Sequence, residues 1–93
     1  MLFVFPDAAR RTFVMRRCLV PIDLIYLDSE ARVLNTHRMS VEPYNRPNWL
    51  LTRYRSDGKA QYVIELAGGT LDELELSSGD AIDIPADLKL RAQ

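Results

Sequence analysis

The sequence is poor in the residues that build disulfides, metal sites and membrane spans. Its one cysteine, Cys18, excludes an internal disulfide and a cysteine metal cluster, and we expect it to be a buried small hydrophobe. Its one histidine, His37, has no partner at HxH or HxxxH spacing, which favours a surface strand residue over a metal ligand or a general base. No run reaches the roughly 18 apolar residues of a transmembrane helix. We therefore expect no metal, no cofactor and no membrane span.

Lysine is scarce, and it is absent from the first 55 residues. Residues 1–55 hold nine arginines against five carboxylates, whereas residues 56–93 hold eight carboxylates against three basic residues. The formal net charge is −1, so neither nucleic acid nor an anionic membrane is an expected partner. We expect the two halves to neutralise each other within a single domain over residues 1–93, a length at which about 60–70% of the unfolded surface is buried.

The N-terminus shows no export signal. The apolar start MLFVF is too short for a signal peptide and lacks its charged beginning. For the chain as given we therefore expect a cytoplasmic protein. The abrupt apolar beginning also favours a trimmed or mature form of something longer.

The apolar stretch from Phe13 to Asp28 organises the rest of the chain. Its second half, Ile22 to Leu27, is apolar on nearly both faces, which is typical of a central strand covered on both sides. Pro21 lacks an N–H group, so we expect a bulge or a strand junction there. A helix is the competing interpretation. The proline in mid-run and the many β-branched and aromatic residues disfavour it.

The other patterns predict short strands separated by turns. Extended segments are expected at 1–5, 12–20, 22–28, 32–39, 60–66 and 81–84, and 49–55 is either a strand or a helical turn. Turns, loops or connections are expected at 6–7, 8–11, 28–31, 40–48 and 56–59. Strands 22–28 and 32–39 would form a hairpin across the turn at 28–31.

A short helix is expected at 70–76. Thr70 and Glu73 have the spacing of a capping box, and Gly79 suits a left-handed C-terminal cap. The last eight residues read as a polar tail or a fraying strand. The expected fold is thus mainly β, a compact sandwich or partly open barrel of about six short strands with one short helix.

Several segments, taken in order, resemble one known family. They are LFVFP at 2–6, RTFVMRRCLVPID at 11–23, Asp28, AQYVIELAGGT at 60–70 and GDAI at 79–82. In order and spacing they are similar to an uncharacterised prokaryotic family, domain of unknown function 192, over residues 2–82. The family pattern runs roughly R-x-F-W-M-K-N-T-L-x-P-L-D. Four positions depart from it: Val14, Arg16, Arg17 and Cys18.

The resemblance implies a small β-rich domain with no established activity. Members are often exported or lipid-anchored behind a signal sequence, and they usually carry a further segment upstream of LFVF. The resemblance therefore implies export if such a segment is missing from this chain.

Three arginines and two carboxylates need an explanation. Arg11, Arg16 and Arg17 carry planar guanidinium groups that suit a carboxylate or a phosphate, so the functional hypothesis is a small anionic ligand or a peptide carboxylate. The structural hypothesis is that Asp23 and Glu65, which lie in apolar strands, are satisfied by these arginines or by turn N–H groups.

An aromatic, basic loop around Tyr44 and Trp49 offers a further surface. It could grip a peptide or a sugar, or it could fold over the core as a lid, and both interpretations stay open.

The sequence favours a non-enzymatic binding or accessory domain that holds a small anionic ligand or a partner chain, because no nucleophile–base pair, metal set or phosphate cradle is present. The alternative is a small hydrolase or transferase with Asp23 and Glu65 as acid and base, which requires both in one pocket about 5–10 Å apart. A second alternative is self-association through an exposed strand edge. The candidate ligand-binding residues are Arg11, Met15, Arg16, Asp23, Trp49 and Glu65.

Overall fold

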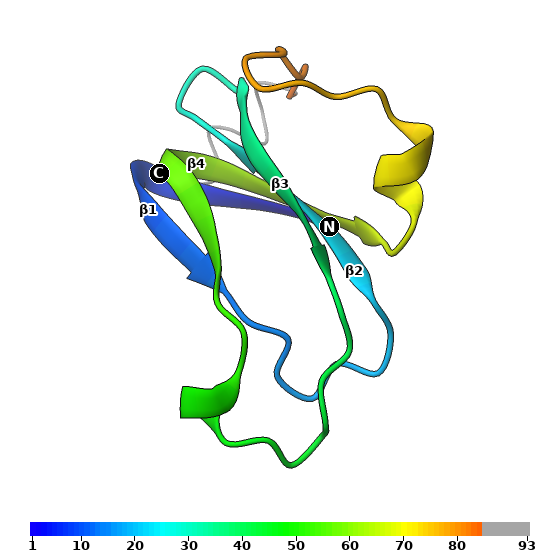
Figure 1. Cartoon of the computed structure of the whole chain (residues 1–93). Helices are drawn as coiled ribbons and strands as arrows, with labels where there is room; N and C mark the ends of the chain where they lie inside the picture. The colour runs from blue at the N-terminus through cyan, green and yellow to red at the C-terminus, as the bar shows by residue number, and fades with distance from the viewer. Residues whose placement is uncertain (85–93) are drawn as a thin grey trace.

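The described part of the chain, residues 1–84, forms in this computed structural model one open four-stranded antiparallel sheet in the order β1-β4-β2-β3 (Figure 1). No α-helix occurs in this part, which adds only two short 3₁₀ turns. The elements are β1 (Leu2–Phe13), β2 (Ile22–Leu27), β3 (Val33–Met39), η1 (Asn48–Leu50), β4 (Tyr54–Ala67) and η2 (Thr70–Glu73). The mainly β expectation is confirmed. The six short strands and the helix are not, because the sheet is built from fewer and longer strands.

The central strand is β2, as its apolar pattern predicts. It pairs with β3 on one side and with β4 on the other, and all its residues from Asp23 to Leu27 are buried. Successive side chains of a strand point to opposite faces, so β2 contributes to two apolar clusters. Ile25 and Leu27 belong to one face of the sheet, and Leu24 and Tyr26 belong to the other.

A different segment of the chain packs against each of these faces. On the first, which we call the C-terminal face, buried Leu71 and Ile84 come from the segment that follows β4. On the second, which we call the aromatic face, Met15 is buried from the loop after β1. Rings of that face pack edge to face, with centroids 6.0 Å apart for Phe13 and Tyr26. The core therefore lies on both sides of β2.

β1 continues through Pro6 and Asp7, where the sequence predicts a turn. The pairing with β4 shifts between Val4 and Ala9, so the intervening residues of β1 form a large bulge. β1 lies at the edge of the sheet, where a proline removes no ladder hydrogen bond from a neighbour. The predicted turn, and with it the separate strand over 1–5 and the connection over 8–11, is wrong because the chain bends here without reversing.

Arg11 provides hydrogen bonds at this bulge. Its guanidinium lies 3.6 Å from the centroid of the Phe5 ring. Its Nε donates to the carbonyl of Ala60 at 2.9 Å, and its Nη2 donates to the carbonyl of Asp7 at 2.7 Å. Gln61 adds a bond from its Nε2 to the carbonyl of Phe5 at 3.2 Å. Side chains therefore satisfy backbone groups where the ladder is interrupted.

A second bulge replaces the turn predicted at 56–59. The ladder shifts again between Arg10 and Thr12, and Ser56 fills the irregularity. Its Oγ accepts the N–H of Arg11 at 2.9 Å and donates to the carbonyl of Gly58 at 2.6 Å. Gly58 has φ 155°, a conformation that favours glycine. The predicted strand 60–66 is thus one part of the longer β4, and the ambiguous segment 49–55 divides between η1 and the start of β4.

The strand predicted over 12–20 ends at Phe13. That residue pairs with Tyr54, the first residue of β4, so the chain has no ladder partner beyond it. The chain turns at Arg16 and Arg17 instead, and Arg17 takes a left-handed conformation with φ 52°. β2 begins directly after Pro21, which confirms the predicted strand junction.

The hairpin of β2 and β3 is confirmed. Its turn is fixed by Asp28, whose Oδ1 accepts the N–H groups of Glu30 at 2.9 Å and Arg32 at 3.0 Å. This is the self-bonding expected of an Asp at the start of a turn.

The helix predicted at 70–76 is wrong, since only the single turn η2 forms. The hydroxyl of Thr70 donates back to the carbonyl of Ala67 at 2.6 Å and caps no N–H group of the turn. Leu71 and Leu76 both pack on the C-terminal face, and the chain after Glu73 leaves the turn to follow that face.

The remaining C-terminal predictions have mixed outcomes. The strand at 81–84 reduces to one bridge between Arg32 and Ala81. Gly79 is left-handed, with φ 92°, but it lies in a turn and caps no helix. The tail predicted for the last eight residues lies outside the described residues.

Two long loops extend from the same end of the sheet. Figure 1 shows the loop after β1 and the loop between β3 and β4 together at one end, away from the hairpin turn that joins β2 to β3. We call this end, residues 14–20 and 40–53, the tip.

Candidate functional site

The register of β2 and β4 tests the hypothesis that two carboxylates act as a catalytic pair, because it shows which face of the sheet each one occupies. Asp23 lies opposite Leu66, and Glu65 lies opposite Leu24. Paired residues of neighbouring strands share a face, so Asp23 points to the C-terminal face and Glu65 to the aromatic face. A common pocket for an acid and a base requires one face. The geometry that a hydrolase or transferase would need from this pair is therefore not met.

Asp23 has a structural partner. The residue is 2% exposed, and its Oδ2 accepts the N–H of Leu71 at 2.7 Å. This is a turn N–H group of the kind that the structural hypothesis expects for a buried carboxylate. Asp23 thereby attaches η2 to the central strand, because Leu71 is the buried residue of that turn.

Arg11 and Met15, two of the predicted ligand residues, serve the core and the sheet. Arg11 is used by the bulge of β1, as described above. Met15 is buried on the aromatic face, with its side chain directed inward from the loop. Neither side chain is available to a ligand at the tip.

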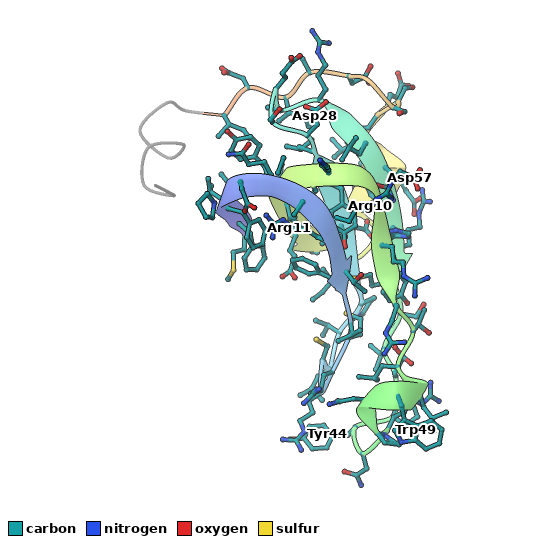
Figure 2. All side chains as sticks on the ribbon, turned by 90° about the vertical axis from the view of Figure 1, so that its left-hand side faces the viewer. Arg10, Arg11, Asp28, Tyr44, Trp49 and Asp57 are labelled. Atoms are coloured by element: carbon teal, nitrogen blue, oxygen red, sulfur yellow. The ribbon has the colours of Figure 1, made fainter. Side chains whose placement is uncertain are left out.

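Arg16, in contrast, lines a cleft at the tip. The cleft has a volume of about 310 Å³ and lies between the Arg16–Arg17 turn and the loop that follows β3. Its lining residues are Arg16, Arg17, Tyr44, Asn45, Arg46, Pro47 and Asn48. Figure 2 shows Tyr44 and Trp49 at this end of the molecule, well away from Arg10 and Arg11. Arginines from two loops that are distant in sequence thus meet at one concave surface.

Arg17 is placed by its backbone and by an aromatic ring. Its backbone is left-handed, with φ 52°, and its guanidinium carbon lies 5.5 Å from the centroid of the Tyr44 ring. A cation over an aromatic face at this distance is attracted by the ring quadrupole. The contact brings the two walls of the cleft together without using the hydrogen-bond donors of Arg17.

Arg46 is fixed by an ion pair. Its Nη1 donates to Oε1 of the buried carboxylate of Glu42 at 2.7 Å, and Glu42 also accepts the N–H of Thr52, at 3.2 Å for Oε2. This network ties the beginning of the loop to its end. One wall of the cleft is therefore held in place by a buried carboxylate that does not itself line the cleft.

The cleft carries uncompensated positive charge. Among residues 1–84, neither Arg16 nor Arg17 has a carboxylate within ion-pair distance, and both are exposed. The lining contains no carboxylate, while Asn45 and Asn48 add neutral amide groups. Such a surface attracts anions, and its guanidinium groups can form paired hydrogen bonds to a carboxylate or a phosphate.

Trp49 lies beside this cleft and is 74% exposed. It belongs to η1, which begins at the cleft residue Asn48. The loop therefore does not fold its tryptophan over the core as a lid. Of the two interpretations of this loop, the exposed surface is the one that agrees with the position of Trp49.

The two remaining special residues lie on the aromatic face. Cys18 is half-buried against that cluster, and its Sγ lies 3.6 Å from the carbonyl oxygen of Arg16. His37 packs between the rings of Tyr26 and Tyr54, and its Nε2 lies 2.8 Å from the carbonyl of Arg55. Within residues 1–84 no three His, Cys, Asp or Glu side chains are grouped as metal ligands. No helix of this part is long and apolar enough to cross a membrane.

The sequence points to part of the cleft and misses the rest. Arg16, Arg17 and Tyr44 are recognisable as exposed polar or aromatic residues, but Asn45, Arg46 and Asn48 carry no motif. The run Asn-Arg-Pro-Asn at 45–48 is the available signal, since it combines turn residues with a cation.

Comparison with known proteins places this fold in a family. The family model for domain of unknown function 192 (DUF192), described as "Uncharacterized ACR", matches residues 1–84. The chain belongs to the DUF192 family. None of the curated proteins matches this DUF192 member.

One solved structure resembles it closely in fold. It is the crystal structure of a protein of unknown function from Novosphingobium aromaticivorans, with a TM-score of 0.73 and 27% sequence identity. The match covers 90% of this chain and 56% of the other, so this chain spans little more than half the length of the protein it matches. These similarities support the DUF192 fold and carry no activity with them.

Proposed function

We propose that this DUF192 member is a non-enzymatic binding module whose tip cleft holds an anionic group, a carboxylate or a phosphate. The observation that carries the proposal is the lining: three arginines and two asparagines surround a cleft of about 310 Å³ that no carboxylate lines. A guanidinium group binds a carboxylate or a phosphate through two parallel hydrogen bonds, which gives both affinity and orientation.

The state of the arginines supports this role. Arg46 is already engaged by Glu42, so it contributes a fixed wall and a partly compensated charge. Arg16 and Arg17 keep their donors free of carboxylates in the described part of the chain. Arg16 and Arg17 are therefore the pair expected to contact the anion. Arg46 positions the loop that faces them.

The chemistry of the lining favours binding over a reaction. The cleft is lined by arginine, asparagine, tyrosine and proline side chains, with no histidine, cysteine, serine or carboxylate among them. A nucleophile with an adjacent base would need residues of those types. The only acid–base pair that the sequence suggests, Asp23 with Glu65, is split between the two faces of the sheet.

Isothermal titration of the protein with inorganic phosphate and with acetate at low ionic strength tests the proposal. The variants are Arg16→Gln and Arg17→Asn, since asparagine tolerates the left-handed backbone at the second position. Each substitution should weaken binding about tenfold, the loss expected for one charge-assisted hydrogen-bonded contact.

Arg10→Gln is the matched control for these variants. Arg10 is an exposed arginine without an ion pair in residues 1–84, and it lies away from the tip (Figure 2). It removes the same charge, so it should leave the affinity nearly unchanged. Equal weakening by all three variants, or full affinity in the double variant of Arg16 and Arg17, would show that the anion does not bind in the cleft.

A further inference from the structure

An exposed apolar platform lies next to the cationic cleft. In η1, Trp49 is 74% exposed and Leu50 is 51% exposed, and no residue of this turn is buried. The next residue, Leu51, is buried, so the chain enters the core immediately after presenting two large apolar side chains to solvent. Apolar side chains gathered at one site of a surface mark contact with another molecule more often than scattered ones do.

The platform and the cleft are continuous. Asn48 lines the cleft and begins η1, while Tyr44 lines the cleft and is itself 57% exposed. Figure 2 shows Tyr44 and Trp49 together at the tip. A ligand whose charged group enters the cleft would therefore have its neighbouring atoms close to aromatic and aliphatic surface.

The turn that carries the platform is ordered by its own hydrogen bonds. The N–H of Leu50 donates to the carbonyl of Pro47 at 2.9 Å, and the N–H of Leu51 donates to the carbonyl of Asn48 at 3.2 Å. The Glu42 carboxylate adds its bond to Thr52. A surface that is already ordered loses less conformational freedom when a partner binds.

We infer that the occupant of the tip is a peptide segment that presents a carboxylate to Arg16 and Arg17 and packs an adjacent apolar side chain against Trp49 and Leu50. The inference rests on the proposed function and names its ligand class. Charge complementarity calls for an anionic group, which a peptide supplies as a carboxylate, since the cleft offers two arginines without a carboxylate partner in residues 1–84. The exposed indole of Trp49 favours an apolar side chain next to that carboxylate, because aromatic residues flanked by arginine are typical of binding sites for protein chains.

An anionic membrane is the less favoured occupant. Each basic residue near such a surface contributes only about 1 kcal/mol, and the cleft supplies two arginines that are not ion-paired in the described residues. A concave cleft also suits a single inserted group better than a flat array of headgroups.

Trp49 provides the test, because it is the one tryptophan of the chain. Two acetylated five-residue peptides are compared. Each peptide ends in two aspartates. The two peptides differ at two positions, which hold leucine in one peptide and glycine in the other. Contact with the platform should shift the emission of Trp49 to shorter wavelength with the leucine peptide, and that peptide should bind about tenfold more tightly than the glycine peptide, since burial of part of two leucine side chains corresponds to such a gain.

Two variants separate the contributions of charge and platform. Arg16→Gln should weaken the binding of both peptides, and Trp49→Ala should abolish the advantage of the leucine peptide when affinity is measured by calorimetry.

Equal affinity of the two peptides would overturn the inference, and Arg16-dependent binding of phosphate in the same protein would then leave the proposed function standing. Failure of both phosphate and peptides to bind would remove the proposed function itself. An emission shift with phosphatidylserine vesicles but not with peptide would identify a membrane as the occupant and overturn the peptide.

Discussion

Asp23 joins two elements that are 48 residues apart in the chain. Its carboxylate is buried in the central strand, and the N–H of Leu71 is buried in η2, so each group satisfies the other in a place that water does not reach. The residue that the sequence offers as a catalytic acid is thus the attachment point of the C-terminal face.

Removal of this carboxylate should cost stability. Asp23→Ala leaves the buried N–H of Leu71 without an acceptor, and we expect the free energy of unfolding to fall by about 2 kcal/mol. Asp23→Asn keeps an acceptor oxygen, so its loss should be about 1 kcal/mol or less. Urea denaturation followed by circular dichroism measures both. Wild-type stability in the alanine variant would contradict the assigned role.

Because Tyr26 is buried, we expect the free energy of unfolding to depend on pH at alkaline pH. Burial raises the pKa of Tyr26 from 10.0 to about 12, against the lowering effect of a backbone hydrogen bond with Phe13. As the pH rises, the unfolded chain therefore loses this proton before the folded protein does. The free energy of unfolding should fall from about pH 10 upward, and this contribution should be lost completely above about pH 12.

The difference between wild type and Tyr26→Phe isolates this effect. Other titrating groups contribute equally to both proteins, so urea midpoints of the two should converge between about pH 10 and about pH 12. At neutral pH the variant should be less stable, because the carbonyl of Tyr54 loses the hydroxyl that donates to it at 2.6 Å. Parallel curves over the whole range would show that the Tyr26 hydroxyl is not buried.

At the scale of the element, the two bulges shape the sheet. They allow β1 and β4 to run past residues that a local pattern assigns to turns, and both bulges are held by contacts between distant parts of the chain. The bond from Arg11 to Ala60 spans 49 residues, and the bond from Arg11 to Ser56 spans 45. Long strands with fixed bends follow from these contacts.

Arg11→Ala should therefore destabilise the protein more than a substitution on an edge strand ordinarily does. The loss of two hydrogen bonds to backbone carbonyls and of the contact with Phe5 should lower the free energy of unfolding by about 3 kcal/mol. Arg10→Ala, at the neighbouring exposed position, should change it by less than about 0.5 kcal/mol. Equal effects of the two substitutions in urea denaturation would contradict the assignment.

The same bulges explain what could be predicted of the fold. The central strand and its hairpin depend on local information, namely the apolar run at 22–27 and the self-bonding Asp28, and both predictions are confirmed. The turns predicted at 6–7 and 56–59 fail because Pro-Asp and Asp-Gly pairs are equally compatible with bulges, and distant partners decide between the two. The helix at 70–76 fails because the chain leaves the turn η2 after Glu73 and packs Leu76 on the C-terminal face, a contact that the local pattern does not contain.

At the scale of the whole molecule, the uneven charge of the chain is only partly balanced. Among the ion pairs of residues 1–84, the Arg38–Asp72 pair at 2.8 Å joins the basic and the acidic half, and the other three lie within the basic half. At the tip, Arg16 and Arg17 have no ion-pair partner in residues 1–84, so an excess of positive charge remains there. Self-association through a strand edge stays a prediction, and the bulge in β1 interrupts the row of backbone groups that pairing along this edge would use.

The candidate site was predictable only in its residue types. The sequence marks Arg16 and Trp49 as candidates, and both lie at the tip, whereas Arg11, Met15 and Asp23 are occupied by the fold. The assembly of the cleft depends on two loops meeting at one end of the sheet. That meeting is set by strand pairing over long separations, which no local pattern contains.

The most direct test of the cleft is a titration of the ¹⁵N-labelled protein with inorganic phosphate at low ionic strength, observed at the arginine Nε–H resonances. The largest chemical-shift changes should occur at Arg16 and Arg17, with Arg10 unaffected. Changes that are largest at Arg10, or that are absent at Arg16 and Arg17 when other arginines respond, would contradict binding in the cleft.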